Sequence, residues 1–200
     1  MFRVIILNRT PELTLNEYNA LLPLVSLEKQ ERIKNYYFKW DAHNSLLGDV
    51  LVRMEICKIM KMKNDEIEFF INAYGKPSLV NNDYIHFNIS HSGNYIACAI
   101  SDKPVGIDIE QIRPVDLKIA ERFFTPYETE YIKDDEHSNR FYEVWTKKEA
   151  YIKCIGKGLY ITLSTFNVLN SDESENLIYH KVFQNDDVIC HVCSTKYEKP

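Results

Sequence analysis

Two short segments in the second half of the chain carry charged residues at spacings that suggest chemistry. In the first, Val-Gly-Ile-Asp-Ile-Glu at 105–110, acidic and apolar residues alternate. Because side chains alternate between the two faces of a strand, this pattern predicts a strand with Asp108 and Glu110 on one face and the isoleucines on the other. Two such carboxylates can bind a cation. An isolated acidic pair more often lies on the solvated face of an edge strand.

The second segment, 145–153, places an acid and a base on one face of a predicted helix. Glu149 precedes Lys153 by about one helical turn. Bulky apolar residues surround these charges, which favours a helix packed at a cleft over a helix with merely solvated ion pairs. Hard oxygen ligands suit Mg²⁺, which binds a few carboxylates together with substrate phosphates. Glu149 would complete such a site with Asp108 and Glu110.

A third polar cluster follows a predicted strand at 85–89. It contains Ser90, His91 and Ser92. A tight hairpin turn and a phosphate site made of the Ser90 hydroxyl, the His91 imidazolium and loop amides are both compatible with this pattern. Two interpretations are also compatible with Lys76. A loop lysine is normally solvated, but the proline that follows it restricts where its side chain points, which would suit a binding site.

The composition restricts the partners of the chain. Its 200 residues carry a formal net charge of −5, which disfavours nucleic acid as a partner, and an anionic ligand would have to meet a local cationic cluster. No apolar run approaches the roughly 18 residues that span a bilayer, and no signal peptide is recognisable. We therefore expect no membrane partner and a cytoplasmic protein with reduced cysteines. Cys190 and Cys193 lack a second pair to complete a zinc site and are expected in a C-terminal strand.

Local patterns predict that both halves combine helices with strands. A helix is expected at 15–27, a new helix is expected to begin after its cap Ser26, and further helices are expected at 41–53, 117–122, 126–133 and 139–155. Strands are expected at 1–8, 67–71, 85–89, 95–100, 105–110, 161–169, 177–183 and 188–193. The break at 101–104 predicts a boundary between an N-terminal half, 1–103, and a C-terminal half, 104–200. Gly48 lowers helix propensity within 41–53, which predicts close packing there.

The order of these motifs resembles that of the 4′-phosphopantetheinyl transferases of the surfactin-synthetase-activating (Sfp) type. The segments that carry the resemblance are 75–77, 87–92, 105–110, 123–124, 145–153 and 156–159, supported by 41–49. The resemblance covers nearly the entire chain. It implies an α+β, pseudo-dimeric fold of two similar halves, with the active site in the cleft between them, and a monomeric enzyme.

The resemblance also implies a reaction. The enzyme would transfer the 4′-phosphopantetheine group of coenzyme A to a serine of an apo acyl or peptidyl carrier protein and would release adenosine 3′,5′-bisphosphate. Its cofactor would be Mg²⁺, with Mn²⁺ as an alternative. By this resemblance Asp108, Glu110 and Glu149 bind the metal. Asp108, Glu149 and Lys153 form the catalytic set, with Glu149 as the general base. Lys148 and Lys153 would hold pyrophosphate oxygens.

The nucleotide end of coenzyme A needs cationic and polar contacts of its own. The family pattern implies that these come from Lys29, Arg32, Lys76, Ser90 and His91, with Ser45 as a weaker candidate. One departure is Asn44, where family members often carry a basic residue. Glu128 matches a family acidic position to which no role is assigned here, and Phe123 and Phe124 are candidates to receive the carrier.

Two other functions use the same residues. A magnesium-dependent enzyme that hydrolyses nucleotide pyrophosphates with water would need the same three acids. A non-catalytic binder of carrier proteins is disfavoured by the intact Asp108, Glu110, Glu149 and Lys153. No G-x-S-x-G, P-loop or G-x-G-x-x-G motif is present, which disfavours α/β-hydrolases, P-loop nucleotidases and dinucleotide-binding enzymes.

Overall fold

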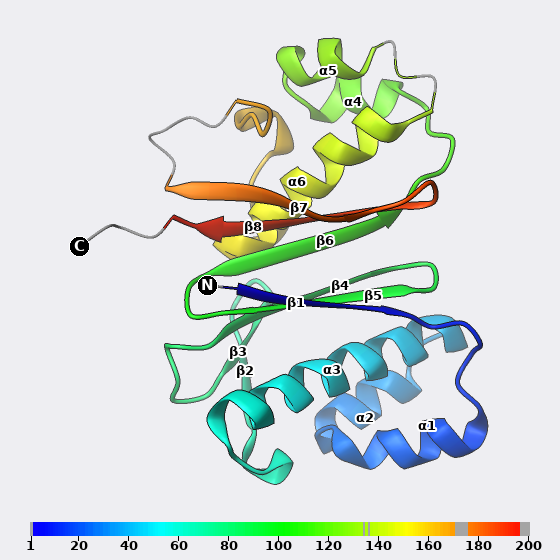
Figure 1. Cartoon of the computed structure of the whole chain (residues 1–200), viewed down its shortest axis with the longest axis vertical. Helices are drawn as coiled ribbons and strands as arrows, with labels where there is room; N and C mark the ends of the chain where they lie inside the picture. The colour runs from blue at the N-terminus through cyan, green and yellow to red at the C-terminus, as the bar shows by residue number, and fades with distance from the viewer. Residues whose placement is uncertain (1, 134, 136, 171–175, 197–200) are drawn as a thin grey trace.

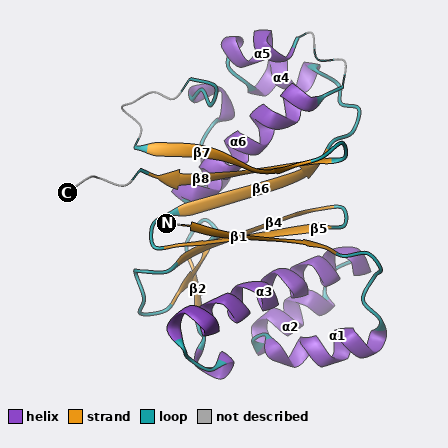
Figure 2. Ribbon diagram, viewed as in Figure 1, coloured by secondary structure: helices purple, strands orange, loops and turns teal. Residues whose placement is uncertain are grey.

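The computed structural model describes residues 2–133, 135, 137–170 and 176–196. Each half of the chain forms a three-stranded antiparallel sheet, and the two sheets pack against each other with helices on the outside (Figure 1). The order of layers is therefore helices, sheet, sheet, helices (Figure 2). This arrangement agrees with the expected α+β, pseudo-dimeric fold.

The N-terminal half contains three helices and two small sheets. In chain order its elements are β1 (Phe2–Asn8), α1 (Leu15–Leu21), α2 (Leu27–Lys34), α3 (Lys39–Met60), β2 (Phe69–Ile71), β3 (Pro77–Leu79), β4 (His86–Ser92) and β5 (Tyr95–Ser101). The sheet order is β1-β5-β4, and β2 pairs with β3 in a separate hairpin. Short 3₁₀ turns cover Leu22–Leu24 and Asn64–Glu66. The first expected helix is thus shorter than predicted, since a 3₁₀ turn containing Pro23 follows α1.

Two local predictions in this half are confirmed. The Ser26 hydroxyl accepts a hydrogen bond from the Lys29 amide and caps α2. A Cβ added at Gly48 would lie 2.8 Å from Ile89 Cγ2, so the glycine allows α3 to pack closely against β4. Apolar residues of α3, including Val52 and Ile56, form a core with the outer face of β4 and β5.

The C-terminal half repeats this plan with its helices on the opposite side. Its elements are β6 (Val105–Gln111), α4 (Lys118–Phe123), α5 (Pro126–Ile132), α6 (Asn139–Ile155), 3₁₀ turns at Gly158–Tyr160 and Leu163–Thr165, β7 (Leu177–Gln184) and β8 (Val188–Thr195). The sheet order is β6-β8-β7. Cys190 and Cys193 are buried in β8, as expected for an ordinary strand.

The strand expected at 161–169 is wrong. The segment contains the 3₁₀ turn Leu163–Thr165 and packs Phe166 and Val168 against α6. Buried side chains, in place of a neighbouring strand, pair with its backbone: Lys148 donates to the Leu163 and Phe166 carbonyls, and Glu128 accepts from the Val168 amide. Because tertiary contacts satisfy these polar groups, the apolar segment needs no sheet.

The two halves meet along β4 and β6, which are edge strands of their sheets. Three amides of β6 donate to side chains of β4: Ile107 N to Asn88 Oδ1 (2.8 Å), Ile109 N to Ser90 Oγ (3.3 Å) and Gln111 N to Ser92 Oγ (3.0 Å). Beside this ladder, the inner faces of both sheets share an apolar core that includes Ala97, Ala99, Ile107 and Ile109. Strand β4 extends through Ser92, beyond the expected end at residue 89, and Gly93, with a φ of 53°, begins the tight turn to β5 that the hairpin alternative predicted.

No helix in the described ranges is long and apolar enough to cross a bilayer.

Candidate active site

An acidic pocket lies where β4, β6 and α6 meet, at the junction of the two halves. It is lined by Ile89, Ser90, His91, Asp108, Glu110, Trp145, Glu149 and Lys153. The structure therefore brings together the three predicted metal ligands, the predicted catalytic lysine, and two of the predicted nucleotide contacts.

The local structure of β6 and α6 explains this meeting. The isoleucines of β6 face the core between the sheets, while Asp108 and Glu110 line the pocket on the other face, as the alternation predicts. Helix α6 packs directly on this face, because a Cβ at Gly106 would overlap the Ala150 carbonyl oxygen. That close approach places Glu149 and Lys153 of α6 in the same pocket as Asp108 and Glu110 of β6.

Asp108 is at the centre of the contacts. Its side chain is buried, with only 3% of the residue exposed. Oδ1 accepts hydrogen bonds from Lys153 Nζ at 2.6 Å and from Ser90 Oγ at 2.8 Å. Oδ2 is buried and has no hydrogen-bond partner. One oxygen is thus fixed by the protein, and the other is an orphaned acceptor in an acidic pocket.

The three carboxylates disfavour one another's ionised forms. Burial raises the pKa of Asp108, although Lys153 and Ser90 oppose this rise. Burial, followed by the charge of Asp108, raises the pKa of Glu110 to about 6. The same two causes raise the pKa of Glu149. Concentrated negative charge of this kind is relieved by a cation.

These residues fit a divalent cation that is shared with a substrate. Within the described residues, no three His, Cys, Asp or Glu side chains are arranged to hold a metal by themselves. Mg²⁺ is usually bound by one or two carboxylates together with substrate phosphates and water, and so does not require a closed protein cage. The orphaned Asp108 Oδ2 and the raised pKa values of its neighbours are consistent with such a shared site.

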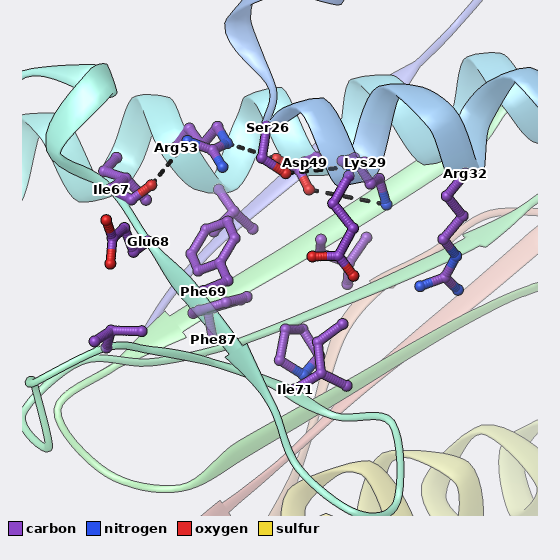
Figure 3. Close-up of a pocket in the computed structure, with 15 residues that line it drawn as sticks. Ser26, Lys29, Arg32, Asp49, Arg53, Ile67, Glu68, Phe69, Ile71 and Phe87 are labelled. Atoms are coloured by element: carbon purple, nitrogen blue, oxygen red, sulfur yellow. Dashed lines mark hydrogen bonds and ion pairs between the residues drawn. The ribbon is translucent and has the colours of Figure 1, made fainter.

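A second pocket, shown in Figure 3, lies between α2, α3 and the β2–β3 hairpin. Lys29 and Arg32 of α2 line it, and the Lys29 ammonium lies 3.8 Å from Asp49 Oδ2. Phe69 and Phe87, whose ring centroids are 5.0 Å apart, contribute to an apolar wall. The pocket thus combines three cations, Lys29, Arg32 and Arg53, with three acids, Glu28, Asp49 and Glu68, beside an apolar wall.

The two pockets adjoin. Ile89 lines both of them. Partial desolvation lowers the pKa of His91, and the positive charges of Lys153 and Lys29 lower it further. His91 therefore experiences the charge of a cation from each pocket.

Lys148 does not line either pocket, which corrects its expected role as a pyrophosphate ligand. Lys148 belongs to α6, and its side chain is fully buried. Its ammonium lies 2.8 Å from Glu128 Oε2 and donates at 2.7 Å to the Leu163 and Phe166 carbonyls. Glu128 is equally buried and also accepts from the Thr125 amide. Glu128 and Lys148 are thus structural residues that hold the segment after α6.

Lys76 and Ser45 also lie outside the two pockets. The Lys76 ammonium donates to the Val105, Lys153 and Cys154 carbonyls, at 3.1, 2.6 and 3.2 Å. With three protons and three carbonyl acceptors, it has no donor left for a phosphate. This corrects its expected role in 3′-phosphate binding. Ser45 is buried in α3 and lines neither pocket.

Some residues at the site were not identified from the sequence. Ser92 donates to Glu110 Oε2 at 2.6 Å. The sequence contained a signal for Ser92, because Asn88, Ser90 and Ser92 alternate with Phe87, Ile89 and His91 along β4. Arg53, which contacts Asp49 Oδ1 at 2.7 Å in the second pocket, stands one helical turn after that acid.

Comparisons with known proteins identify the family of the chain. A model of the "4′-phosphopantetheinyl transferase superfamily" matches residues 104–198, and a model of the "4′-phosphopantetheinyl transferase, N-terminal" matches residues 11–103. The 4′-phosphopantetheinyl transferase Sfp of Bacillus subtilis is 43% identical over 159 residues, which is 78% of this chain and 71% of that protein. The 4′-phosphopantetheinyl transferase gsp of Aneurinibacillus migulanus is 44% identical over 173 residues, which is 84% of this chain and 71% of that protein. The chain therefore belongs to the 4′-phosphopantetheinyl transferases of the Sfp type.

Proposed function

We propose that this transferase moves the 4′-phosphopantetheine group from coenzyme A to a serine of an apo acyl or peptidyl carrier protein, in a reaction that requires a divalent metal and releases adenosine 3′,5′-bisphosphate. The observation that carries the proposal is the junction, through Ile89, of a three-carboxylate pocket with a pocket that carries Lys29 and Arg32 beside an apolar wall. One pocket suits a pyrophosphate with its cation, and the other suits the nucleotide. Monomeric state and cytoplasmic location stay predictions from the sequence.

The residues of the acidic pocket have distinct proposed roles. Asp108, Glu110 and Glu149 would hold Mg²⁺ or Mn²⁺, which when bound would neutralise pyrophosphate charge. Lys153 would contact a pyrophosphate oxygen and stabilise the charge of the departing nucleotide phosphate. Lys29 and Arg32 would contact the nucleotide end as cations, and His91, whose pKa is lowered, would contact it as a neutral hydrogen-bonding group.

The proposed transfer is a substitution at phosphorus. The hydroxyl oxygen of the carrier serine bonds to the β-phosphorus of coenzyme A, and the bond from that phosphorus to the bridging oxygen breaks. Adenosine 3′,5′-bisphosphate leaves with the electron pair. Glu149 accepts the serine proton as the general base.

The direct test is to incubate the protein with coenzyme A, MgCl₂ and an apo carrier protein, and to weigh the carrier by mass spectrometry. The expected result is a carrier heavier by one phosphopantetheine group, at a serine identified by peptide mapping. A carrier in which that serine is replaced by alanine is the matched control. A panel of acyl and peptidyl carriers would then show which class is preferred.

Hydrolysis of the coenzyme A pyrophosphate by water is the alternative reaction that the same acids could support. Chromatography of the nucleotide products in the same incubation separates the two reactions. An unmodified carrier beside cleaved coenzyme A would contradict the proposed transfer, whereas adenosine 3′,5′-bisphosphate formed in equal amount to modified carrier would support it.

A further inference from the structure

The ladder between β4 and β6 contains two serines that make the same pair of contacts. Ser90 Oγ accepts from the Ile109 amide and donates to Asp108 Oδ1. Ser92 Oγ accepts from the Gln111 amide and donates to Glu110 Oε2. In each case the amide follows the carboxylate residue directly in the chain.

The third rung of this ladder lacks a carboxylate. Asn88 Oδ1 accepts from the Ile107 amide, and the residue before Ile107 is Gly106, which has no side chain. Asn88 therefore only joins the two strands. The two serines join the strands in the same way and, in addition, contact the acids proposed to bind the metal.

The geometry of a hydroxyl explains why each serine can join the strands and contact a carboxylate at the same time. A hydroxyl has one proton, and when its oxygen accepts from a backbone amide, the proton points away from that amide. The 2.6 Å bond from Ser92 to Glu110 has the length of a charge-assisted bond. Glu110 is otherwise a long side chain with several rotatable bonds, and the bond to Ser92 engages Oε2.

We propose that Ser92 is a positioning residue that orients Glu110 for metal binding, and that the N-terminal half thereby sets the geometry of the metal site in the C-terminal half. This inference rests on the proposed function, because it assumes that Glu110 is a metal ligand. Ser92 does not line the acidic pocket, so it acts through Glu110 and not on the substrate. Ser90 shares this geometry but also contacts Lys153, which makes Ser92 the cleaner position to test.

The test is calorimetric titration of Mn²⁺ into the full chain saturated with coenzyme A. Because hydrogen bonds to metal ligands typically contribute about 10- to 100-fold to metal affinity, Ser92→Ala should weaken Mn²⁺ binding by roughly that factor. The affinity for coenzyme A in the absence of metal should stay unchanged. Ser92→Thr, which keeps the hydroxyl, should restore most of the Mn²⁺ affinity.

Asn88→Ala is the matched control, because it removes one rung of the ladder without touching a carboxylate. It should lower the temperature of unfolding while leaving Mn²⁺ affinity within about threefold of the parent protein. Equal losses of Mn²⁺ affinity in Asn88→Ala and Ser92→Ala would overturn the proposal, since general loosening of the junction would then explain both. If Ser92→Ala does not fold, Ser92→Cys keeps the shape with a weak donor and should lose Mn²⁺ affinity similarly.

Measuring both Mn²⁺ binding and carrier modification with the parent protein distinguishes failure of this inference from failure of the proposed function. Parent protein that binds Mn²⁺ in a Ser92-dependent way but modifies no carrier would support the positioning role and contradict the transfer. A Ser92→Ala protein that binds Mn²⁺ as tightly as the parent, while the parent modifies its carrier, would overturn the positioning role alone. Parent protein that binds no Mn²⁺ would overturn it as well.

Discussion

The Lys76 ammonium lies 2.6 Å from the backbone oxygen of Lys153, whose own ammonium lies 2.6 Å from Asp108 Oδ1. A loop of the N-terminal half therefore holds the C-terminal end of α6, next to the predicted catalytic lysine. Asn72 of the same loop donates to the Gly156 carbonyl at 3.0 Å. A cation at a helix C-terminus is favourable because it pairs with carbonyls that have no partner within the helix.

Replacing Lys76 should therefore affect the catalytic step more than the binding of the 3′-phosphate. Lys76→Met removes three hydrogen bonds from a charged group and should cost about 2 kcal/mol of unfolding free energy. We expect kcat to fall by the same factor with coenzyme A and with 3′-dephospho-coenzyme A, measured by steady-state kinetics. Lys34→Met, at a lysine of α2 that is paired only with an exposed glutamate, serves as the control. A loss confined to coenzyme A would show that Lys76 contacts the 3′-phosphate.

Asp108 is the acid whose loss should be most severe. Asp108→Asn keeps the shape of the side chain but removes the charge that contacts Lys153 and the proposed metal. We expect carrier modification to fall by at least roughly 100-fold, as for other charged groups that act in the transition state. Single-turnover assays in excess Mg²⁺ would measure this, and circular dichroism would show that the fold is intact. Near-normal turnover of Asp108→Asn would remove this residue from the site.

Glu110 should make the stability of the metal-free protein depend on pH. Its pKa is raised from 4.5 to about 6, so ionisation of Glu110 is less favourable in the folded state than in the unfolded state. The contribution of Glu110 to stability is therefore complete below its ordinary pKa and is lost as the pH rises through about 6. The difference corresponds to roughly 2 kcal/mol at pH 7 and above.

Glu110→Gln should remove this dependence. Compared with the parent, the variant should be more stable above pH 7 and similar near pH 4, in urea denaturation without metal. Asp108 and Glu149 also have raised pKa values, so the parent curve contains their contributions, and the difference between the two proteins isolates Glu110. Curves that stay parallel from pH 4 to pH 8 would contradict the prediction.

Lys148 should be important for stability and not for coenzyme A binding. Lys148→Met leaves the buried Glu128 carboxylate without its cation, which typically costs about 3 kcal/mol of unfolding free energy. Adding Glu128→Gln to this variant should recover part of the loss, because it removes the unpaired buried charge. The recovery is incomplete because the Thr125 and Val168 amides donate to different carboxylate oxygens, and a glutamine keeps only one oxygen. Urea denaturation measures both. A large loss of coenzyme A affinity in a folded Lys148→Met protein would restore its role as a ligand.

The local geometry of the catalytic elements could be predicted from the sequence. The alternation in β6 identified which face carries Asp108 and Glu110, and the helix expected at 139–155 has the observed bounds, Asn139–Ile155. These features depend on periods of two and about 3.6 residues, which each segment carries within itself. Local patterns failed for the apolar segment 161–169, because side chains of α5 and α6 bind its backbone and replace a strand partner.

The sequence by itself thus determined the family motifs, the strand and helix that carry the acids, and the residue types available for catalysis. Only the tertiary structure decided which lysine faces the pocket, since Lys148 and Lys153 stand on one helix but only Lys153 reaches Asp108. It likewise decided that Lys76 binds helix carbonyls and that Ser92 holds Glu110. The physical reason is that an ammonium or a hydroxyl bonds to whichever acceptors lie nearest in space, and β4, β6 and α6 become neighbours only when the two halves pack together.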